Sequence, residues 1–368
     1  MKVATVCPQR DFRILFLTRR YPPSTGGVQT HCLQLFTHLA PLLKIKLIAL
    51  GHSHLLHLGW FMPCTLVRAL CEVIFRRVDA IYFGDGVTSC LAPFLRPFSK
   101  ARFVVTIHGL EMTYSQPLFS HLIKWGVACC QHVVVTGENT RKITVQAGVP
   151  EEKIEVVYMG IKPLVLPPQR HQALKVAFEE RHGIRFGRDR ILLNYGRQVR
   201  RKGLAEFAAK GVPLLEKDIK FFVGGLGPEY EKLKQLREEL GLQHRMILLG
   251  WLDDETTAML RAEADLFLMP NIQVANDVEG FGIAQLEGMY AGLPVVAFAV
   301  DALVESVREG GYLIPANDYR AFVDGIQKHL SLPASEKEAL REQARTYVRR
   351  EYSWRDTTAR YLRVIQGD

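Results

Sequence analysis

Two short segments of this sequence combine residue types that could bind a ligand carrying both negative charge and hydroxyl groups. Glu279 and Glu287 lie in the segment EGFGIAQLE, around the start of a predicted helix at residues 283–290. The earlier segment GRQVRRKG, residues 196–203, places several cations between two glycines. Carboxylates accept hydrogen bonds from hydroxyl groups, and cations bind phosphates. Together the two segments indicate a ligand that is part sugar and part diphosphate.

The basic segment follows the predicted strand ILLNYG, and the next helix should begin soon after it. The N-terminus of a helix presents free amides and a partial positive charge, which already favours a phosphate. Arg197 would add a planar fork of donors and Lys202 a point charge. The alternative is a solvated basic turn, which four cations in six residues make less attractive (Arg197, Arg200, Arg201 and Lys202).

The glutamate segment gives the strongest local signal in the chain. Gly280 and Gly282, on either side of Phe281, permit an unusual turn before the helix. Glu279 alone could simply be stabilised by the helix dipole, and Glu287 alone could be an ordinary surface residue. The pair in this glycine-rich setting favours binding of sugar hydroxyls.

Three other strand ends carry candidate ligand contacts. Gly26 and Gly27 would let a phosphate or sugar approach the backbone closely, and the turn from Gly225 to Pro228 could do the same. Gly227 belongs to this second turn. His108 follows the predicted strand RFVVTI and could donate to sugar hydroxyls. For each of these, a plain structural turn or a structural histidine is the alternative.

The length and composition indicate a globular chain of two domains. The chain has 368 residues, of which 48% are hydrophobic and 23% charged. Its net charge of +9 comes from the first half, because residues 1–170 contain 19 Lys and Arg against 9 Asp and Glu. A one-sided basic surface suits an acidic substrate, an anionic membrane or nucleic acid. We do not expect nucleic acid, because no known nucleic-acid-binding motif is present.

Short apolar runs alternate with helix-length segments throughout, which predicts parallel sheets with helices on both faces. The proline-rich segment at residues 161–171 interrupts the alternation. We therefore expect a first domain at residues 1–165 and a second at residues 172–350, with a terminal helix at about 352–368 returning to the first. Ligands of such sheets bind beyond the carboxyl ends of the strands, so a deep cleft between the domains is the expected site. The predicted strands are Arg13–Thr18, Lys44–Leu50, Asp79–Phe83, Arg102–Ile107, His132–Thr136, Ile154–Tyr158, Ile191–Gly196, Ile219–Gly224, Arg245–Gly250, Ala264–Pro270, Leu293–Phe298 and Gly311–Pro315.

The cysteines and the hydropathy pattern indicate the compartment. Seven irregularly spaced cysteines, without a C-x-x-C pair, favour reduced thiols and a cytoplasmic protein. No run of about 18 uncharged apolar residues is found, so we expect no membrane-spanning helix. The segment from Leu55 to Arg77 mixes aromatic and aliphatic residues with Arg68 and Arg76, as interfacial helices do. It predicts peripheral contact with an anionic membrane, and an internal helix of the first sheet is the equal alternative.

With these residues in hand, nearly the whole chain resembles the retaining glycosyltransferases of family 4, which have the GT-B fold. The motif GR-x-x-x-x-KG matches at Gly196, Arg197, Lys202 and Gly203, and EGFGIAQLEGMYAGLPVVA is similar to the family's glutamate motif. The Gly26-Gly27 loop, VVTIHGLE, VGGLGPEYEKL and YSWRDTTARYL resemble further family segments. The resemblance implies an α/β fold of two doubly wound, Rossmann-like domains facing a deep cleft.

The resemblance also implies roles for the candidate residues. Arg197 and Lys202 would bind the diphosphate of a UDP- or GDP-linked sugar, assisted by the amide of Gly27. Glu279 and His108 would contact the sugar, and Glu287 would hold the ribose. The enzyme would transfer a hexosyl unit, with retention, to a lipid-linked, lipopolysaccharide or exopolysaccharide acceptor.

The sequence also predicts that neither a cofactor nor a metal is needed. No DxD cluster stands where a metal would be required, and Asp253-Asp254 falls in an expected helix-capping turn. One departure from the family pattern is Val300-Asp301-Ala302-Leu303, where paired glycines and a proline are common, and it leaves the donor sugar open. The alternatives are a nucleotide-sugar epimerase of the same fold and a non-catalytic nucleotide-sugar-binding protein. A phosphorylase would need a pyridoxal lysine, for which no candidate stands out.

Overall fold

The computed structural model describes residues 11–367 except residues 25, 53, 115 and 276. The chain divides into two compact units, and each contains one sheet. Unit 1 comprises the chain up to Gly160 together with the segment from Tyr352 onward, and unit 2 comprises Ile161–Glu351.

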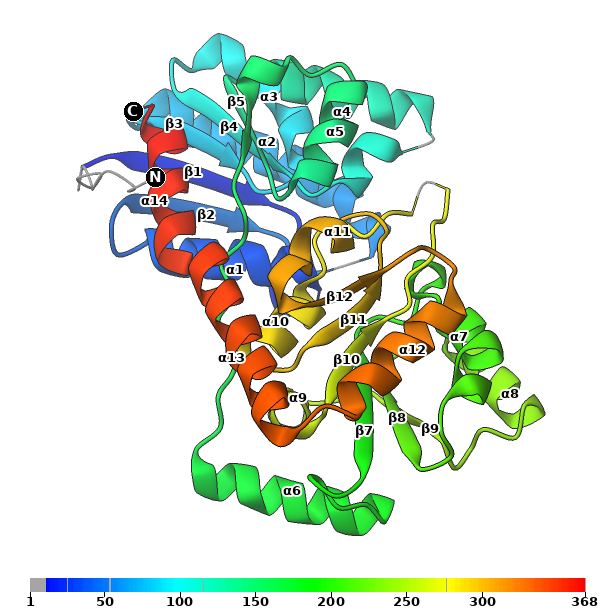
Figure 1. Ribbon diagram of the computed structural model, residues 1–368. Coiled ribbons are helices and arrows are strands. Elements are labelled where there is room, and N and C mark those ends of the chain that lie inside the picture. The colour runs from blue at the N-terminus through cyan, green and yellow to red at the C-terminus, as the bar shows by residue number, and fades with distance from the viewer. Residues whose placement is uncertain (1–10, 25, 53, 115, 276, 368) are drawn as a thin grey trace. The chain divides into compact units, whose positions relative to one another are not determined.

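Unit 1 is built on a parallel six-stranded sheet in the order β2-β1-β3-β4-β5-β6, with helices on both of its faces (Figure 1). Its strands are nearly continuous apolar runs, because a parallel sheet covered on both faces has no solvent-facing side. The elements are β1 (Arg13–Thr18), α1 (Gly27–Leu39), β2 (Lys44–Ala49), α2 (Leu58–Phe75), β3 (Ala80–Phe83), α3 (Ala92–Leu95), β4 (Arg102–Ile107), α4 (Pro117–Ala128), β5 (His132–Val135), α5 (Glu138–Gln146), β6 (Ile154–Val156) and α14 (Trp354–Gln366).

Unit 2 repeats the architecture with a second parallel six-stranded sheet, in the order β12-β11-β10-β7-β8-β9. The elements are α6 (Pro168–His182), β7 (Arg190–Tyr195), α7 (Leu204–Lys210), β8 (Ile219–Gly224), α8 (Tyr230–Glu239), β9 (Met246–Gly250), α9 (Asp254–Glu263), β10 (Leu266–Met269), α10 (Ile283–Tyr290), β11 (Val295–Phe298), α11 (Leu303–Ser306), β12 (Gly311–Ile314), α12 (Tyr319–Leu330) and α13 (Ala334–Glu351). The prediction of two doubly wound parallel sheets is therefore confirmed.

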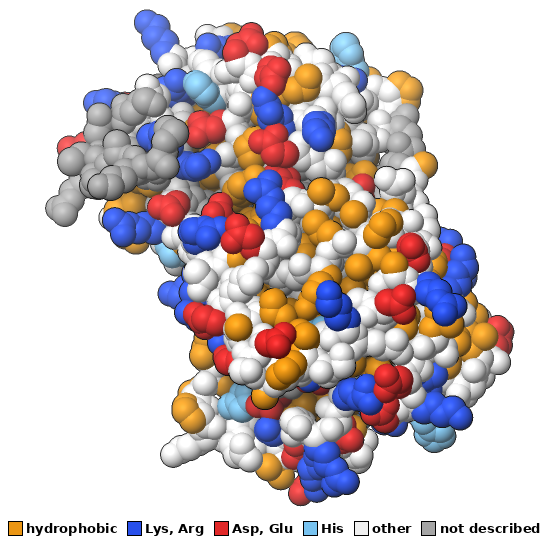
Figure 2. Space-filling view, in the orientation of Figure 1, with side chains coloured by type: hydrophobic (Ala, Val, Ile, Leu, Met, Phe, Trp, Pro, Cys, Tyr) orange, Lys and Arg blue, Asp and Glu red, His pale blue; other side chains and the backbone are white. Residues whose placement is uncertain are grey.

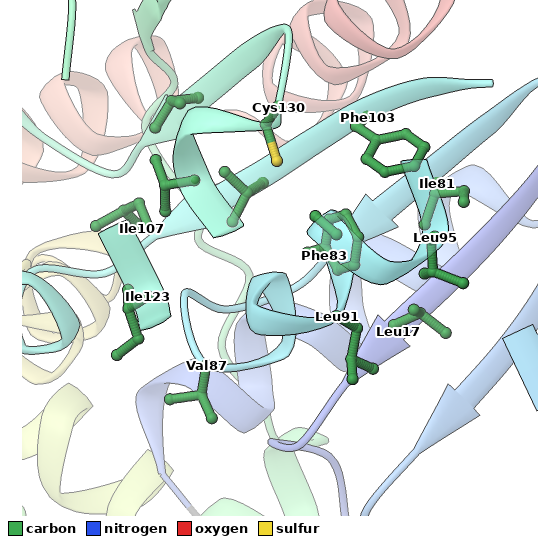
Figure 3. Packing of buried hydrophobic residues seen from close by; sticks show 14 of the residues in the cluster. Leu17, Ile81, Phe83, Val87, Leu91, Leu95, Phe103, Ile107, Ile123 and Cys130 are labelled. Carbon is green, nitrogen blue, oxygen red and sulfur yellow. The ribbon is translucent and has the colours of Figure 1, made fainter. Parts of the chain in front are cut away.

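The core of unit 1 shows how alternate residues of one strand serve both faces of the sheet. Leu17, Ile81 and Phe83 belong to a buried apolar cluster with residues of α3 and α4 (Figure 3). On the opposite face, Tyr82 packs edge-on against Tyr361 of α14, with their ring centroids 6.0 Å apart. Helix α14 is thus part of the core of unit 1, although the whole of unit 2 precedes it in the chain.

The starts of α9 and α14 differ in how they are capped. Asp253 caps α9, because its carboxylate accepts a hydrogen bond of 2.7 Å from the backbone N–H of Thr256. This confirms the interpretation of Asp253-Asp254 as a capping turn. Ser353 occupies the N-cap position of α14, but its side chain makes no capping hydrogen bond.

Helix α2 differs from the sequence expectation. Among the described residues it is the one helix that is long and apolar enough to cross a membrane, by length and composition alone, with a mean hydropathy of 1.5. The sequence criterion was too strict, because Arg68 and Glu72 do not lower the mean hydropathy enough to exclude the segment. Since Phe61, Thr65 and Ala69 are buried against the rest of unit 1, we interpret α2 as a helix of this fold.

The distribution of surface charge and the state of the cysteines can be compared with the sequence predictions. On the face drawn in Figure 2, Lys and Arg side chains are interspersed with Asp and Glu side chains. The six cysteines among the described residues are all free, and Cys7 lies outside these residues.

Candidate functional site

The strand order places the candidate residues of unit 2 at a particular point of its sheet. The order reverses between β7 and β10, which are neighbours although β8 and β9 separate them in sequence. At such a reversal the loops leave the two strands in opposite directions and open a crevice at the carboxyl edge. Lys202 follows β7, and Glu279 follows β10. The two residues predicted to hold phosphate and sugar are thus brought to the same edge.

Lys202 and Glu279 form a buried ion pair, with 2.7 Å between Nζ and Oε2. Only 8% of Lys202 and 7% of Glu279 is exposed. The same carboxylate oxygen accepts a hydrogen bond of 3.1 Å from Nδ2 of Asn271 and lies 3.5 Å from Nε of Arg201. A cation and a carboxylate of the kind needed for a phosphorylated sugar therefore lie in direct contact.

The charges of this cluster determine its protonation. Burial alone would raise the pKa of Glu279, but Lys202 and Arg201 outweigh burial and hold the pKa below its ordinary value of 4.5. Glu279 is consequently an anion at neutral pH. It can accept hydrogen bonds from hydroxyl groups but cannot donate one.

The four cations of the basic segment have different environments. Arg201 donates to Asp277 over 2.7 Å, and Arg200 pairs with Glu206. Arg197 is exposed, and its guanidinium has no partner among the residues that the structure describes. It is therefore the cation of this loop that remains available for an external anion.

Glu287 lies on α10 in a separate contact network. Its Oε2 accepts a hydrogen bond of 2.8 Å from Nη1 of Arg261 and lies 3.0 Å from the hydroxyl of Tyr195. Burial raises the pKa of Glu287 above its ordinary value, although Arg261 and Tyr195 oppose this. Tyr195 is the last residue of β7 and directly precedes Gly196 and Arg197. Its hydrogen bond to Glu287 therefore holds Glu287 next to the start of the basic segment.

The predicted glycines of unit 2 have structural reasons of their own. Gly225 has a φ of 101°, and a Cβ there would overlap the carbonyl oxygen of Gly196. A Cβ on Gly227 would likewise overlap the carbonyl oxygen of Gln198. These contacts pack the loop after β8 against the loop after β7, so both glycines support the basic segment. Gly282, at the N-cap position of α10 with a φ of 76°, ends the turn that includes Gly280 and Phe281.

In unit 1 the strand order reverses between β1 and β3, and of the candidate residues only Gly26 and Gly27 follow one of these two strands, β1. Gly27 is the first residue of α1, after Gly26, so its amide belongs to the helix N-terminus, where N–H groups lack intrahelical acceptors. His108 follows β4, and its Nε2 lies 3.0 Å from the carbonyl oxygen of Gly84. Because a carbonyl only accepts, Nε2 donates this bond, which leaves Nδ1 to contact a ligand.

Further contacts fix His108. Its backbone N–H donates to Glu111 over 3.1 Å, and its ring meets the buried ring of His31 edge-on, with 5.3 Å between centroids. Nε2 of His31 lies 3.1 Å from the hydroxyl of Tyr361 in α14. Burial, with His108 nearby, holds the pKa of His31 well below its ordinary value, so His31 is neutral.

Several residues of the site were missed by the sequence reasoning. Asn271 and Asp301 each come soon after a strand, so the rule that strand ends carry function could have found them. Asp301 accepts a hydrogen bond of 3.0 Å from the backbone N–H of Glu279. Arg261 lies within α9, where nothing in the sequence distinguishes it from a surface arginine. The predicted residues divide between the units, with Gly26, Gly27 and His108 in unit 1 and the others in unit 2.

Comparison with solved structures defines the fold class. Over 97% of this chain, sucrose-phosphate synthase from Thermosynechococcus elongatus superposes with a TM-score of 0.77 at 18% identity, covering 98% of that chain. Anabaena HepE, solved in complex with UDP-glucose, superposes over the same share and 100% of its own chain with a TM-score of 0.75 at 16% identity. With its two parallel sheets, the chain therefore has the GT-B fold.

The family follows from the sequence comparisons. The model of the group 1 glycosyl transferases matches residues 177–347, and the model of glycosyltransferase family 4 matches residues 25–163. An uncharacterised glycosyltransferase of Methanocaldococcus jannaschii is 25% identical over 93% of this chain and 95% of its own length. A GDP-mannose-dependent alpha-(1-6)-phosphatidylinositol monomannoside mannosyltransferase of Mycolicibacterium smegmatis is 25% identical over 96% of this chain and 98% of its own. The two models together match most of the chain, so the predicted resemblance to a group 1 glycosyltransferase of the GT-B fold is confirmed.

Proposed function

We propose that this glycosyltransferase moves a hexosyl unit from a UDP- or GDP-linked sugar to a hydroxyl group of a lipid-linked, lipopolysaccharide or exopolysaccharide acceptor. The M. smegmatis relative, by its name, uses GDP-mannose and a phosphatidylinositol mannoside, and HepE was solved with UDP-glucose. A further relative in Escherichia coli, 26% identical over 78% of this chain, is named for colanic acid biosynthesis. These names support the class of donor and acceptor.

The observation that carries the proposal is the buried contact between Lys202 and Glu279 at the reversal of strand order in unit 2. A phosphate needs a cation, and sugar hydroxyls need a carboxylate acceptor. Lys202 and Glu279 supply both within a single cluster, and Arg197 adds a guanidinium on the same loop that is unpaired among the described residues. Glu287 is the candidate for the ribose hydroxyls.

The proposed chemistry breaks the bond between the anomeric carbon and the diphosphate while the acceptor hydroxyl attacks the same carbon. Negative charge gathers on the leaving diphosphate, and Arg197, Lys202 and the amide of Gly27 would stabilise it. We propose that this stabilisation replaces a metal and that no cofactor takes part. His108 would contact the sugar through Nδ1, because its Nε2 is occupied by Gly84.

We also propose that the reaction retains the anomeric configuration, by attack on the face from which the diphosphate leaves. Glu279 is assigned to the sugar hydroxyls and not to a covalent intermediate, which a mechanism of retention by two displacements would need. Nuclear magnetic resonance of the first product would show the configuration, and addition of a chelator would test the independence from metal. An inverted product or loss of turnover on chelation would contradict these two parts.

The acceptor and the location of the protein are proposed from unit 1. Helix α2 exposes apolar side chains along its outer face, with 52% of Trp60, 61% of Val67 and 80% of Phe75 exposed. Arg76 and Arg77 follow at its C-terminal end. An apolar face bordered by arginines is what a helix needs to lie in the surface of an anionic bilayer. We therefore propose a cytoplasmic protein in peripheral contact with the membrane that carries its acceptor.

Substitution of Arg197 by alanine tests the diphosphate assignment. Because Arg197 has no partner in the part of the chain that the structure describes, the variant should fold as the native protein does while losing one charged hydrogen bond to the ligand. We expect the Kd for UDP or GDP to rise by about tenfold or more, since such bonds contribute ~1.5–3 kcal/mol. Isothermal titration calorimetry measures the change.

Arg200→Ala is the matched control, because Arg200 lies on the same loop but pairs with Glu206. Its Kd should remain close to that of the native protein. An equal loss of affinity in both variants would show that the loss reflects only the lower net charge of the loop. No loss of affinity in Arg197→Ala would contradict the assignment of Arg197 to the diphosphate.

Analysis of the products with and without an acceptor distinguishes sugar transfer from epimerisation of the donor and from binding without turnover.

A further inference from the structure

Asp301 occupies an unusual backbone position next to the Glu279 cluster. It lies after β11 with a φ of 47°, in the left-handed region that favours glycine and tolerates Asp and Asn better than other residues. Its Oδ2 accepts the hydrogen bond from the backbone N–H of Glu279, at 3.0 Å. The carboxylate therefore anchors the loop that presents Glu279.

The charges around Asp301 do not balance. Asp277 is paired with Arg201 at 2.7 Å, and Glu279 with Lys202 at the same distance. Asp301 has no ion-pair partner in the described part of the chain. Burial raises the pKa of Asp301 above its ordinary value, and the charges of Glu279 and Asp277 act in the same direction. The cluster thus has one carboxylate more than it has cations.

A second feature of the cluster indicates an external ligand. Asn271 is 1% exposed, and its Nδ2 donates to Glu279, but its Oδ1 has no hydrogen-bond partner among the residues described by the structure. A buried amide oxygen without a partner is costly, so a hydrogen-bond donor supplied by a ligand would relieve it. The acceptors gathered here are Oδ1 of Asn271 and the carboxylates of Glu279 and Asp301. All of them accept hydrogen bonds, so they can bind donors such as hydroxyl groups and would repel a further carboxylate.

We propose that Asp301 is a specificity-determining residue that restricts the donor to neutral, hydroxyl-rich sugars and excludes hexuronic acids. Its unbalanced charge repels a carboxylate on the sugar ring, and its bond to Glu279 holds the hydroxyl-binding loop in place. This inference rests on the proposed function, because it concerns the sugar of the same nucleotide-linked donor.

The test compares donors that differ only in charge. Calorimetry gives the Kd of UDP, UDP-glucose and UDP-glucuronic acid, and of GDP, GDP-mannose and GDP-mannuronic acid. For the native protein we expect the neutral sugar nucleotide to bind about tenfold or more tightly than its uronate, because juxtaposed like charges are strongly unfavourable. Asp301→Asn keeps the backbone conformation and the acceptor for Glu279 but removes the charge. In this variant the Kd of the uronate should lie within about threefold of the Kd of the neutral sugar nucleotide, while the Kd of UDP or GDP should be unchanged.

The control is Asn317→Gly, which removes an exposed side chain at another position of positive φ, 65°, in the same unit. It should keep the native ratio. Asp301→Gly removes both the charge and the anchor of Glu279, so it should narrow the ratio between the two Kd values and also lower kcat.

The outcomes distinguish the two levels of the proposal. Uronates bound as tightly as neutral sugars by the native protein, or a ratio unchanged in Asp301→Asn, would overturn the role of Asp301 alone. Failure of the native protein to bind UDP or GDP would overturn the proposed function, and this inference with it.

Discussion

At the scale of single residues, the contact between Lys202 and Glu279 serves both stability and the proposed ligand binding. In the unliganded protein the lysine compensates the charge of the buried carboxylate, so neither charge is buried without a partner. We propose that Lys202 also binds the donor diphosphate, in which case Arg201 and Asn271 would continue to hold Glu279. Binding of phosphate and presentation of the sugar-binding carboxylate would then be coupled.

Glu279→Gln tests this pair through stability and its dependence on pH. The pKa of Glu279 is lowered in the folded protein, so its contribution is present above its ordinary value of 4.5 and is lost as the pH falls through the folded pKa. At neutral pH we expect the variant to be less stable by about 2 kcal/mol, because Lys202 loses a charged partner. The difference should shrink as the pH falls below 4.5. Urea denaturation over a series of pH values measures it.

The control for this series is Glu180→Gln, a substitution of an exposed residue of α6. It should change the free energy of unfolding little at any pH. A difference for Glu279→Gln that stays constant or grows toward low pH would contradict the lowered pKa.

Single residues were predicted from sequence only where local context made them unusual. Glu279 and Lys202 stood out because glycines and a strand end flanked them. Asn271 contacts Glu279 within the segment between β10 and α10, and Asp301 contacts it from the end of β11. Both contacts depend on how these loops fold, which the sequence alone does not show. Arg261 reaches Glu287 from the face of a helix, and only the packing of α9 against α10 shows this.

At the scale of elements, α2 is unusual because both its buried side and its exposed side are largely apolar. Its buried side is a narrow row of Phe61, Thr65 and Ala69, while its exposed side is also largely apolar. Exposed apolar surface of this extent on a soluble domain marks an interaction site. The helix thus has two apolar faces, of which the rest of unit 1 covers one.

Serine substitutions on the exposed face test the membrane contact. Trp60→Ser combined with Val67→Ser removes apolar area from the outer face and spares the buried row. We expect the fraction of protein that co-sediments with phosphatidylglycerol vesicles to fall severalfold, because binding scales with the apolar area inserted. Native protein should bind phosphatidylcholine vesicles less well, and added salt should weaken its binding to the anionic ones.

Phe98→Ser is the matched control, because Phe98 is similarly exposed in unit 1 but lies outside α2. Its binding to vesicles should match that of the native protein. If the native protein fails to bind anionic vesicles at low salt, peripheral membrane contact through α2 is wrong.

The elements themselves were largely readable from the sequence. Each predicted strand corresponds to an observed one with ends shifted by at most two residues, because strands buried on both faces appear as unbroken apolar runs. Strand order could not be read in the same way. It depends on which strands pair across the sheet, and periodicity along one strand carries no information about its neighbours.

At the scale of the whole molecule, the chain passes from unit 1 to unit 2 after Gly160 and returns after Glu351. The returning helix α14 completes a buried polar chain in unit 1. The Tyr361 hydroxyl lies 3.1 Å from both His31 and Thr106, and Thr106 lies 2.7 Å from the hydroxyl of Tyr82. Through His31 this chain reaches the ring of His108, so α14 supports the candidate site of unit 1.

Tyr361→Phe tests this support. The variant keeps the ring but leaves Nε2 of His31 buried without a partner, so we expect a loss of about 1–3 kcal/mol in the free energy of unfolding. Urea denaturation measures the loss. Tyr230→Phe is the control, because the hydroxyl of Tyr230 has no partner within the described residues, and its stability should be unchanged. Equal stability of Tyr361→Phe and the native protein would show that the polar chain contributes nothing.

The late position of α14 has a consequence for biosynthesis. On the ribosome, β3 and β4 emerge early, but the helix that covers Tyr82 and Thr106 is translated only after all of Ile161–Glu351. The part of the first sheet that α14 covers therefore stays exposed during most of translation, while unit 2 can already form its core. Unit 1 is translated first but completes its fold last. We therefore expect nascent chains halted before residue 352 to bind chaperones.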